Sequence, residues 1–120
     1  MYYITGDVHG NFRDLKYRCE KYNLTQDDTL IILGDLCANY FLDERDDAFK
    51  AKLQSLGLTL FCVHGNHEER PEKIEGYRQL KWNGGWVLYE EAYPNLLFAI
   101  DGEVYHINGK TVVTCGGAYS

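Results

Sequence analysis

The chain has 120 residues, a net charge of −6 at pH 7 and an apolar share of 45%, which suits one small domain with a buried core and excludes a disordered chain. The acidic balance argues against unspecific nucleic-acid binding, which depends on Lys and Arg, and leaves nucleic acid only as a possible substrate. No apolar run approaches the roughly 20 residues that span a bilayer, and no basic signal-peptide region begins the chain. We therefore expect a cytoplasmic protein with no membrane partner.

The first half of the chain predicts a parallel βαβαβ unit. A strand at residues 2–4 is followed by a helix over residues 12–22, where Asn11 can cap the start and apolar residues recur at helical spacing. The unbroken apolar run at residues 30–33 predicts a strand that is buried on both faces of a sheet. A third strand follows at residues 58–63, and the spacing favours right-handed crossovers.

A loop over residues 37–40 and a second helix from about Asp43 connect the second and third strands, and Gly57 should end this helix. We expect Leu42 and three later apolar residues to face the sheet. Four acidic residues lie between positions 43 and 47. They could be mistaken for metal ligands, but we interpret them as a solvated first turn, because the helix dipole favours acids there.

The second half of the chain has a different pattern. Residues 68–85 predict a long surface segment with one short helix near Pro71. Residues 96–115 then alternate strands with tight turns at Asp101-Gly102 and Asn108-Gly109, dipeptides that suit type I′ hairpins because both central residues need positive φ. The predicted fold class is α/β, with a parallel βαβαβ unit followed by an antiparallel β-meander, in one domain over residues 1–120.

The cysteines are scattered and form no C-x-x-C pair. Three of the four lie in or beside apolar strands, where a cysteine packs as a small hydrophobic residue. We therefore expect reduced thiols in a reducing compartment, and neither disulfides nor a zinc cluster. The residues concerned are Cys19, Cys37, Cys62 and Cys115.

Polar residues follow the three parallel strands at their carboxyl ends. Asp7 and His9 follow the first strand, Asp35 follows the second, and Asn66 and His67 follow the third. Because parallel strands share their carboxyl edge, these three turns should lie side by side. A lone Gly-Asp would be interpreted as a turn cap, whereas three such turns together predict a metal site.

The donor types at this edge suit divalent cations. Asp7 and His9 can bind one cation through a carboxylate oxygen and an imidazole nitrogen, and Asp35 can bridge it to a second. Asn66 offers an amide oxygen, and His67 is better placed as a proton donor or phosphate partner. Two divalent ions about 3.5–4 Å apart would lower the pKa of a bridging water and neutralise the developing charge of a phosphate. The implied reaction is phosphoester hydrolysis.

The motifs G-D-V-H-G at residues 6–10, G-D at residues 34–35 and G-N-H-E at residues 65–68 resemble the first three motifs of the calcineurin-like metallophosphoesterases, in order and with ordinary spacing. The resemblance implies a sandwich of two β-sheets flanked by helices, of which this chain would form half or more. It also implies a cofactor of manganese, iron, zinc or nickel ions.

The resemblance assigns roles to the same five residues. It implies metal binding by Asp7, His9 and Asn66, a metal bridge at Asp35, and a general acid or phosphate ligand at His67. Up to two ions are expected. One should be bound more firmly, because three of these residues serve one position and two serve the other.

The chain departs from the family pattern in two places. Protein phosphatases and dinucleoside tetraphosphate hydrolases have a second motif G-D-x-V-D-R-G, whereas here the chain reads G-D-L-C-A-N-Y and lacks the arginine. Neither substrate class is therefore assigned. The family's last motifs, a lone histidine and a G-H-x-H, do not follow the strand at residues 111–115. Two histidines are left over: a surface or packing role is expected for His106, and a functional role stays open for His64.

Two hypotheses from different classes follow. The first is a metal-dependent phosphoesterase that hydrolyses phosphomonoesters or phosphodiesters with a metal-activated water, and that is weak or inactive as this 120-residue chain. The second is a non-catalytic module that binds a metal or a partner. We also expect a homodimer, because a C-terminally truncated domain ending at Ser120 would leave apolar sheet surface near Val112 and Val113 uncovered.

Overall fold

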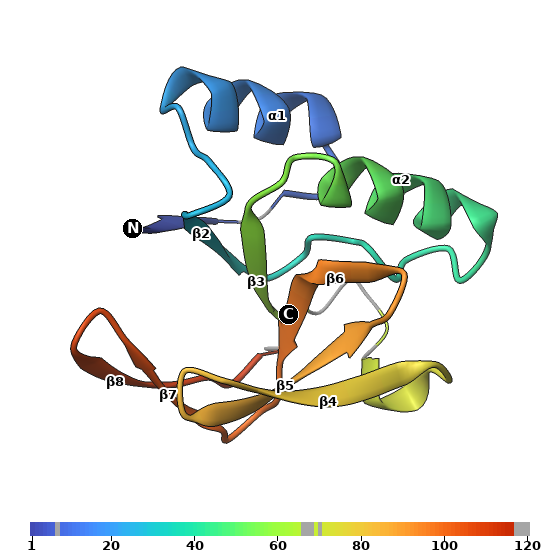
Figure 1. Ribbon diagram of the computed structural model, residues 1–120. Coiled ribbons are helices and arrows are strands. Elements are labelled where there is room, and N and C mark those ends of the chain that lie inside the picture. The colour runs from blue at the N-terminus through green and yellow to red at the C-terminus, as the bar shows by residue number, and fades with distance from the viewer. Residues whose placement is uncertain (7, 66–68, 70, 117–120) are drawn as a thin grey trace.

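The computed structural model describes residues 1–6, 8–65, 69 and 71–116, and Figure 1 shows how the elements are arranged. In chain order the elements are β1 (Tyr2–Thr5), α1 (Phe12–Lys21), β2 (Thr29–Leu33), α2 (Glu44–Gln54), β3 (Thr59–Val63), the short 3-10 helix η1 (Pro71–Lys73), β4 (Tyr77–Trp82), β5 (Gly85–Glu90), β6 (Tyr93–Ala99), β7 (Val104–Ile107) and β8 (Lys110–Val113). No helix in the described part of the chain is long and apolar enough to cross a membrane.

A six-stranded mixed sheet forms the centre of the molecule, in the order β1-β2-β3-β6-β5-β4. Strands β1, β2 and β3 pair in parallel, and β6 adds a fourth parallel strand beside β3. Strands β5 and β4 continue the sheet in antiparallel pairing. The predicted α/β class, with parallel strands followed by antiparallel ones, is confirmed.

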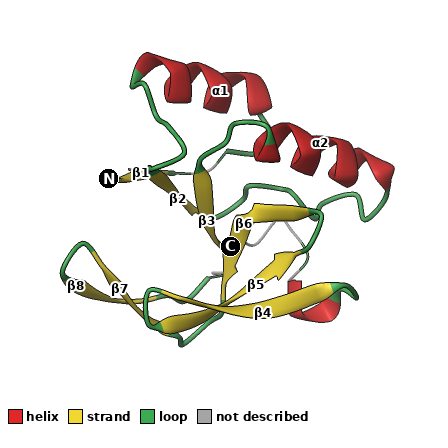
Figure 2. Ribbon diagram, in the orientation of Figure 1, coloured by secondary structure: helices red, strands yellow, loops and turns green. Residues whose placement is uncertain are grey.

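The two faces of this sheet have different covers. Figure 2 shows α1 and α2 on one side and the β7-β8 hairpin on the other. Leu30 and Ile32 point to the helices and pack with Leu15 and Leu53, while Ile31 packs on the opposite face with residues of the hairpin. Residues 30–32 of β2 are therefore buried on both faces, as the apolar run predicts, whereas Leu33 at the end of the run is exposed.

Both helices begin at side-chain caps. The side-chain oxygen of Asn11 accepts a hydrogen bond from the Asp14 amide at 3.1 Å, which confirms the predicted cap of α1. Helix α2 is capped in the same way by Asp43, one residue before its start at Glu44. The expectation that Leu42 faces the sheet is wrong: this residue precedes the cap, has a φ of 59° and is exposed.

The prediction of a long surface segment over residues 68–85 is wrong for most of these residues. The short helix near Pro71 is present as η1, but β4 and the start of β5 follow it as a hairpin. Its turn at Asn83 and Gly84 has φ values of 48° and 87°, the positive pair that a type I′ turn requires. The inner residues of β4 are exposed, so this edge strand lacks the apolar alternation that reveals a strand in a sequence.

The antiparallel meander is composed of other strands than predicted. It consists of β4, β5 and β6, whereas β7 and β8 form a separate two-stranded sheet. The turn at Asn108-Gly109 has positive φ at both residues, as expected. At Asp101-Gly102 the chain crosses from one sheet to the other, because the fully buried Tyr105 holds β7 against the sheet face through hydrogen bonds with the Ile100 amide and the Trp86 carbonyl.

All four cysteines lie in the described ranges. None of them is in a disulfide there; Cys19 and Cys62 are buried, Cys37 is partly buried and Cys115 is exposed. The two buried thiols belong to the core between the sheet and the helices.

Candidate metal centre

The first and second turns are joined through their backbones at the carboxyl edge of the sheet. The His9 amide donates a hydrogen bond to the Asp35 carbonyl at 2.7 Å, and the Gly10 amide donates to the Leu36 carbonyl at 3.2 Å. The turn after β1 is thereby fixed to the turn after β2. Two of the predicted site residues, His9 and Asp35, are thus brought together, as the parallel arrangement predicts.

The third turn packs directly on Asp35. Gly65 is buried, and a Cβ atom built on it would overlap both the carboxylate and the backbone nitrogen of Asp35. Only a residue without a side chain allows this approach, which gives the glycine of the third motif a physical reason. The Asp35 side chain itself is 4% exposed, so its carboxylate is held away from bulk water beside the third turn.

The remaining predicted site residues are not tested. Asp7, Asn66 and His67 lie outside the residues that the structure describes. Within the described ranges, no group of three or more His, Cys, Asp or Glu side chains is close enough to hold a metal ion. The assignment of these three residues stays a prediction, and the structure contributes the placement of His9 and Asp35.

The turns at this edge contain strained backbone. His9, Asp35 and Cys37 have φ values of 52°, 48° and 65°, in the left-handed region that residues other than glycine rarely adopt. Each such residue costs on the order of 1 kcal/mol or more, and such residues gather where a site must hold a fixed geometry. Three of the seven positive-φ residues other than glycine in the described ranges thus lie at the edge of the sheet where the motifs are.

Sequence reasoning treated Asn39 as an ordinary loop residue and missed its position. Its side chain is 2% exposed, and its amide nitrogen donates to the Tyr77 hydroxyl at 2.8 Å. The backbone carbonyl of Asn39 accepts a hydrogen bond from the Glu69 amide at 3.0 Å. Burial raises the pKa of Tyr77, which keeps the phenol neutral. Asn39 therefore connects the loop after Asp35 to the chain just beyond the third motif and to β4.

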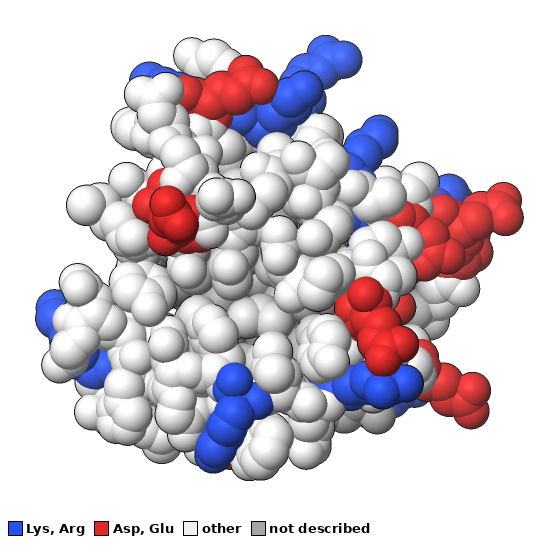
Figure 3. All heavy atoms as spheres, viewed as in Figure 1, with Lys and Arg blue, Asp and Glu red and all other residues white. Residues whose placement is uncertain are grey.

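The acidic cluster at the start of α2 is only partly the solvated turn that we expected. Asp43, Glu44 and Asp47 are exposed, and Figure 3 shows acidic side chains gathered at this end of the helix. Asp46 is the exception, because it is buried and its carboxylate accepts hydrogen bonds from the backbone of the preceding loop. Its sequence context resembles that of its exposed neighbours, so no signal in the sequence separates it from them.

The two spare histidines differ in their surroundings. His64 directly follows β3 and is partly buried. A Cβ atom on Gly116 would overlap the backbone carbonyl of His64, so the chain after β8 returns to this edge of the sheet. The Gly116 amide donates to the side chain of Asp101 at 2.9 Å. His106 lies on β7 with its side chain exposed, and its amide donates to the Asn83 carbonyl at 2.7 Å. This contact is compatible with the packing role expected for His106.

The mixed sheet and the joined turns define an α/β protein in which the turns that contain His9, Asp35 and Gly65 lie together at the carboxyl edge of the parallel strands. The family model of the calcineurin-like phosphoesterases matches residues 2–120, and the chain belongs to this family. The resemblance drawn from the three motifs is thereby confirmed, and the match extends well beyond them. Members of the family generally bind divalent metals. Comparisons with curated proteins and with solved structures find no significant match.

Proposed function

We propose that this protein hydrolyses phosphomonoesters or phosphodiesters with a metal-activated water. The observation that carries the proposal is the junction of the three motif turns: His9 bonded to Asp35 through the backbone, and Gly65 packed on the Asp35 carboxylate. Membership of the calcineurin-like phosphoesterases supports the reaction class.

The donor set at this edge fits a divalent cation. A carboxylate shielded from water and an imidazole at the same edge are ligands that manganese, iron, zinc or nickel accept. In the proposal Asp7 and His9 hold one ion, Asp35 bridges to a second, and Asn66 adds an amide oxygen to the second position. Bound divalent cations would supply a hydroxide nucleophile near neutral pH and neutralise charge on the phosphate.

The protein's own groups have separate tasks in this proposal. The backbone bonds between the first two turns keep His9 and Asp35 in register, and Gly65 sets the approach of the third turn. His67 donates a proton to the leaving oxygen or holds the phosphate. The free cysteines suit a reducing compartment, and we place this activity in the cytoplasm.

A non-catalytic binding module is the less favoured alternative. A module that only binds a partner does not need three strained residues at the carboxyl edge of the sheet, whereas a site that must keep its ligands fixed does. The close packing of Gly65 on Asp35 supports the same choice, because it fixes one carboxylate rather than creating a surface.

Metal binding is the first test. We expect manganese titration calorimetry to give one tight and one weaker site, and Asp35→Asn to weaken binding more than Asn66→Ala, because the bridging carboxylate contributes charge to both positions. Asp27→Asn is the matched control, since Asp27 is exposed and precedes β2 at the opposite end of the strand. Equal metal content in the Asp35→Asn and Asn66→Ala variants would contradict the bridging role.

Hydrolysis is the second test. With manganese present we expect slow turnover of p-nitrophenyl phosphate or its bis ester, lost in Asp35→Asn and retained in Asp27→Asn. The rate should lie below the roughly 1–1000 per second of ordinary enzymes, because the family's later histidine motifs are not among these 120 residues. A chain that binds manganese but hydrolyses neither ester would favour the binding module.

A further inference from the structure

A cavity of about 690 Å³ opens beside the metal centre and takes no part in the function described so far. Its lining begins at His9 and Gly10 of the first motif and at Cys37 after the second. It then runs along the loop before α2 and the exposed side of that helix. We call it the aromatic groove; its further lining residues are Phe12, Tyr40, Phe41, Arg45, Asp46, Ala48, Phe49 and Lys52. One end of the groove is therefore at the metal centre, and the rest is lined by aromatic and charged side chains.

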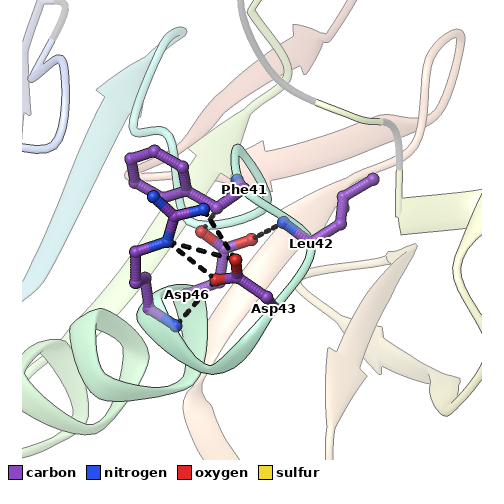
Figure 4. A network of polar contacts seen from close by, with 5 residues as sticks. Phe41, Leu42, Asp43 and Asp46 are labelled. Atoms are coloured by element: carbon purple, nitrogen blue, oxygen red, sulfur yellow. Dashed lines mark hydrogen bonds and ion pairs between the residues drawn. The ribbon is translucent and has the colours of Figure 1, made fainter.

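The loop that presents the aromatic side chains is fixed by a buried carboxylate. Asp46 accepts hydrogen bonds from the amides of Phe41, at 3.1 Å, and Leu42, at 2.6 Å, and is itself 4% exposed (Figure 4). Hydrogen bonds to an ionised acceptor are the stronger kind. The backbone at Tyr40 and Phe41 therefore has little freedom, although their side chains lie at the surface.

The aromatic rings are held in place while they stay open to solvent. The Arg45 guanidinium lies 3.8 Å from the centroid of the Phe41 ring, and its Nη2 donates to the Asp43 carboxylate at 2.7 Å. Hydrogen bonding to Asp43 also raises the pKa of Arg45. Tyr40 meets Phe41 edge to face, with ring centroids 4.9 Å apart. Even so, Tyr40 is 54% and Phe41 48% exposed.

Exposed aromatic side chains on a fixed backbone are typical of a binding surface, because little conformational freedom is lost when a ligand stacks on them. A volume of about 690 Å³ lies in the range of small-molecule sites. Lys52 lines the same groove and is exposed, so it adds a positive charge that favours an anionic ligand. The groove thus offers two exposed aromatic rings, a cation and an end at the metal centre.

We propose that the groove binds the organic part of the phosphoester substrate and that this part contains a planar aromatic ring, as a nucleotide does. The ring stacks on the face of one of these two aromatic side chains, Tyr40 or Phe41, whose planes are 87° apart, and the phosphate lies at the His9 end. This proposal rests on the proposed function for the place of the phosphate, whereas the stacking surface is independent of any metal. The proposal assigns substrate preference to the loop after Asp35, which lacks the arginine of the G-D-x-V-D-R-G motif.

The test compares two ligands that differ only in the base. Binding of AMP and of ribose 5-phosphate to the metal-free chain is measured by protein-observed NMR titration. We expect AMP to bind about tenfold more tightly or better, since stacking of a base on aromatic side chains contributes roughly 1–3 kcal/mol. Equal affinity for the two ligands would overturn the proposal.

Variants locate the stacking surface. Tyr40→Leu with Phe41→Leu keeps apolar bulk and removes both ring faces, and should reduce the AMP preference to less than about twofold. Tyr17→Leu with Tyr22→Leu is the matched control, because both of these tyrosines are 60% exposed beside or on α1, and it should keep the preference. Thermal unfolding confirms that each variant is folded, and the single variant Tyr40→Leu replaces the double variant if it is not. Retention of the full preference in the Tyr40 and Phe41 variants would overturn the proposal.

The outcome separates this inference from the proposed hydrolysis. A chain that binds manganese and shows no AMP preference contradicts the groove alone. A chain that prefers AMP in the absence of metal but never binds manganese contradicts the metal centre and supports the stacking surface.

Discussion

Replacing Gly65 by alanine tests the junction on which the candidate metal centre depends. The added methyl group would overlap the carboxylate and the backbone nitrogen of Asp35. The nitrogen belongs to a turn that is bonded to His9, so it cannot move without disturbing the first motif as well. The methyl group of the variant can therefore be accommodated only by a shift of the backbone at Asp35.

The expected loss follows from overpacking. Extra methyl groups in a closely packed site typically cost about 1–3 kcal/mol. At about 2.1 cal/mol/K of unfolding entropy per residue, a chain of 120 residues should then show a melting temperature lower by about 4–12 °C. Reversible urea unfolding gives the free energy, and manganese titration of the same variant should show weaker binding because the Asp35 carboxylate must turn away.

Gly6→Ala is the matched control. Gly6 stands directly before the aspartate of the first motif, as Gly65 stands before the asparagine of the third, and both glycines lie outside the positive-φ region. A Cβ on Gly6 meets no atom of the described residues within 4 Å. Gly6→Ala should therefore be neutral or slightly stabilising. Equal stability and equal manganese affinity in the two variants would refute the close approach of the third turn to Asp35.

Three further outcomes are expected. Tyr77→Phe should destabilise the fold by about 1–3 kcal/mol, measured by urea unfolding, because the buried amide of Asn39 loses its acceptor; Tyr17→Phe at an exposed site should not. Burial raises the pKa of Tyr77, so its contribution is fully present below the pKa of about 10 of an unfolded tyrosine and is lost as pH rises above it. Unfolding at pH 8 and pH 11 should therefore show a smaller loss in Tyr77→Phe than in the parent chain. Finally, we propose a homodimer, since Ile4 and Leu33 are 68% and 51% exposed on the sheet face that the hairpin leaves open. Light scattering at about 100 μM tests it, and a stable monomer of 13.9 kDa would contradict it.

Local patterns in the sequence were sufficient for the parallel half of the fold. The run at residues 30–33 predicted a strand buried on both faces, and the structure places Ile31 and Ile32 in separate cores. Asn11 and the helical spacing after it predicted α1 with its cap. These signals are short-range, because burial of a strand or a helix face imposes a period on the residues themselves.

The antiparallel half depended on contacts that are distant in the sequence. Strand β4 has exposed inner residues and is defined by its pairing with β5, so its own pattern is weak. The turn at Asp101-Gly102 has the composition of a hairpin, yet Tyr105 turns the next strand onto the sheet face through the Trp86 carbonyl. Only the packing of that ring decides between pairing beside β6 and crossing to the second sheet.

The sequence by itself determined which turns carry the candidate metal centre, because the residue types and their position after buried strands are local properties. It named His9 and Asp35 and their family. Only the tertiary structure decided that Gly65 must lack a side chain and that Asn39 and Asp46 are buried supports rather than loop and surface residues. The physical reason is that burial and hydrogen bonding of a polar side chain depend on partners from other segments, such as Tyr77 for Asn39, which no pattern of neighbouring residues specifies.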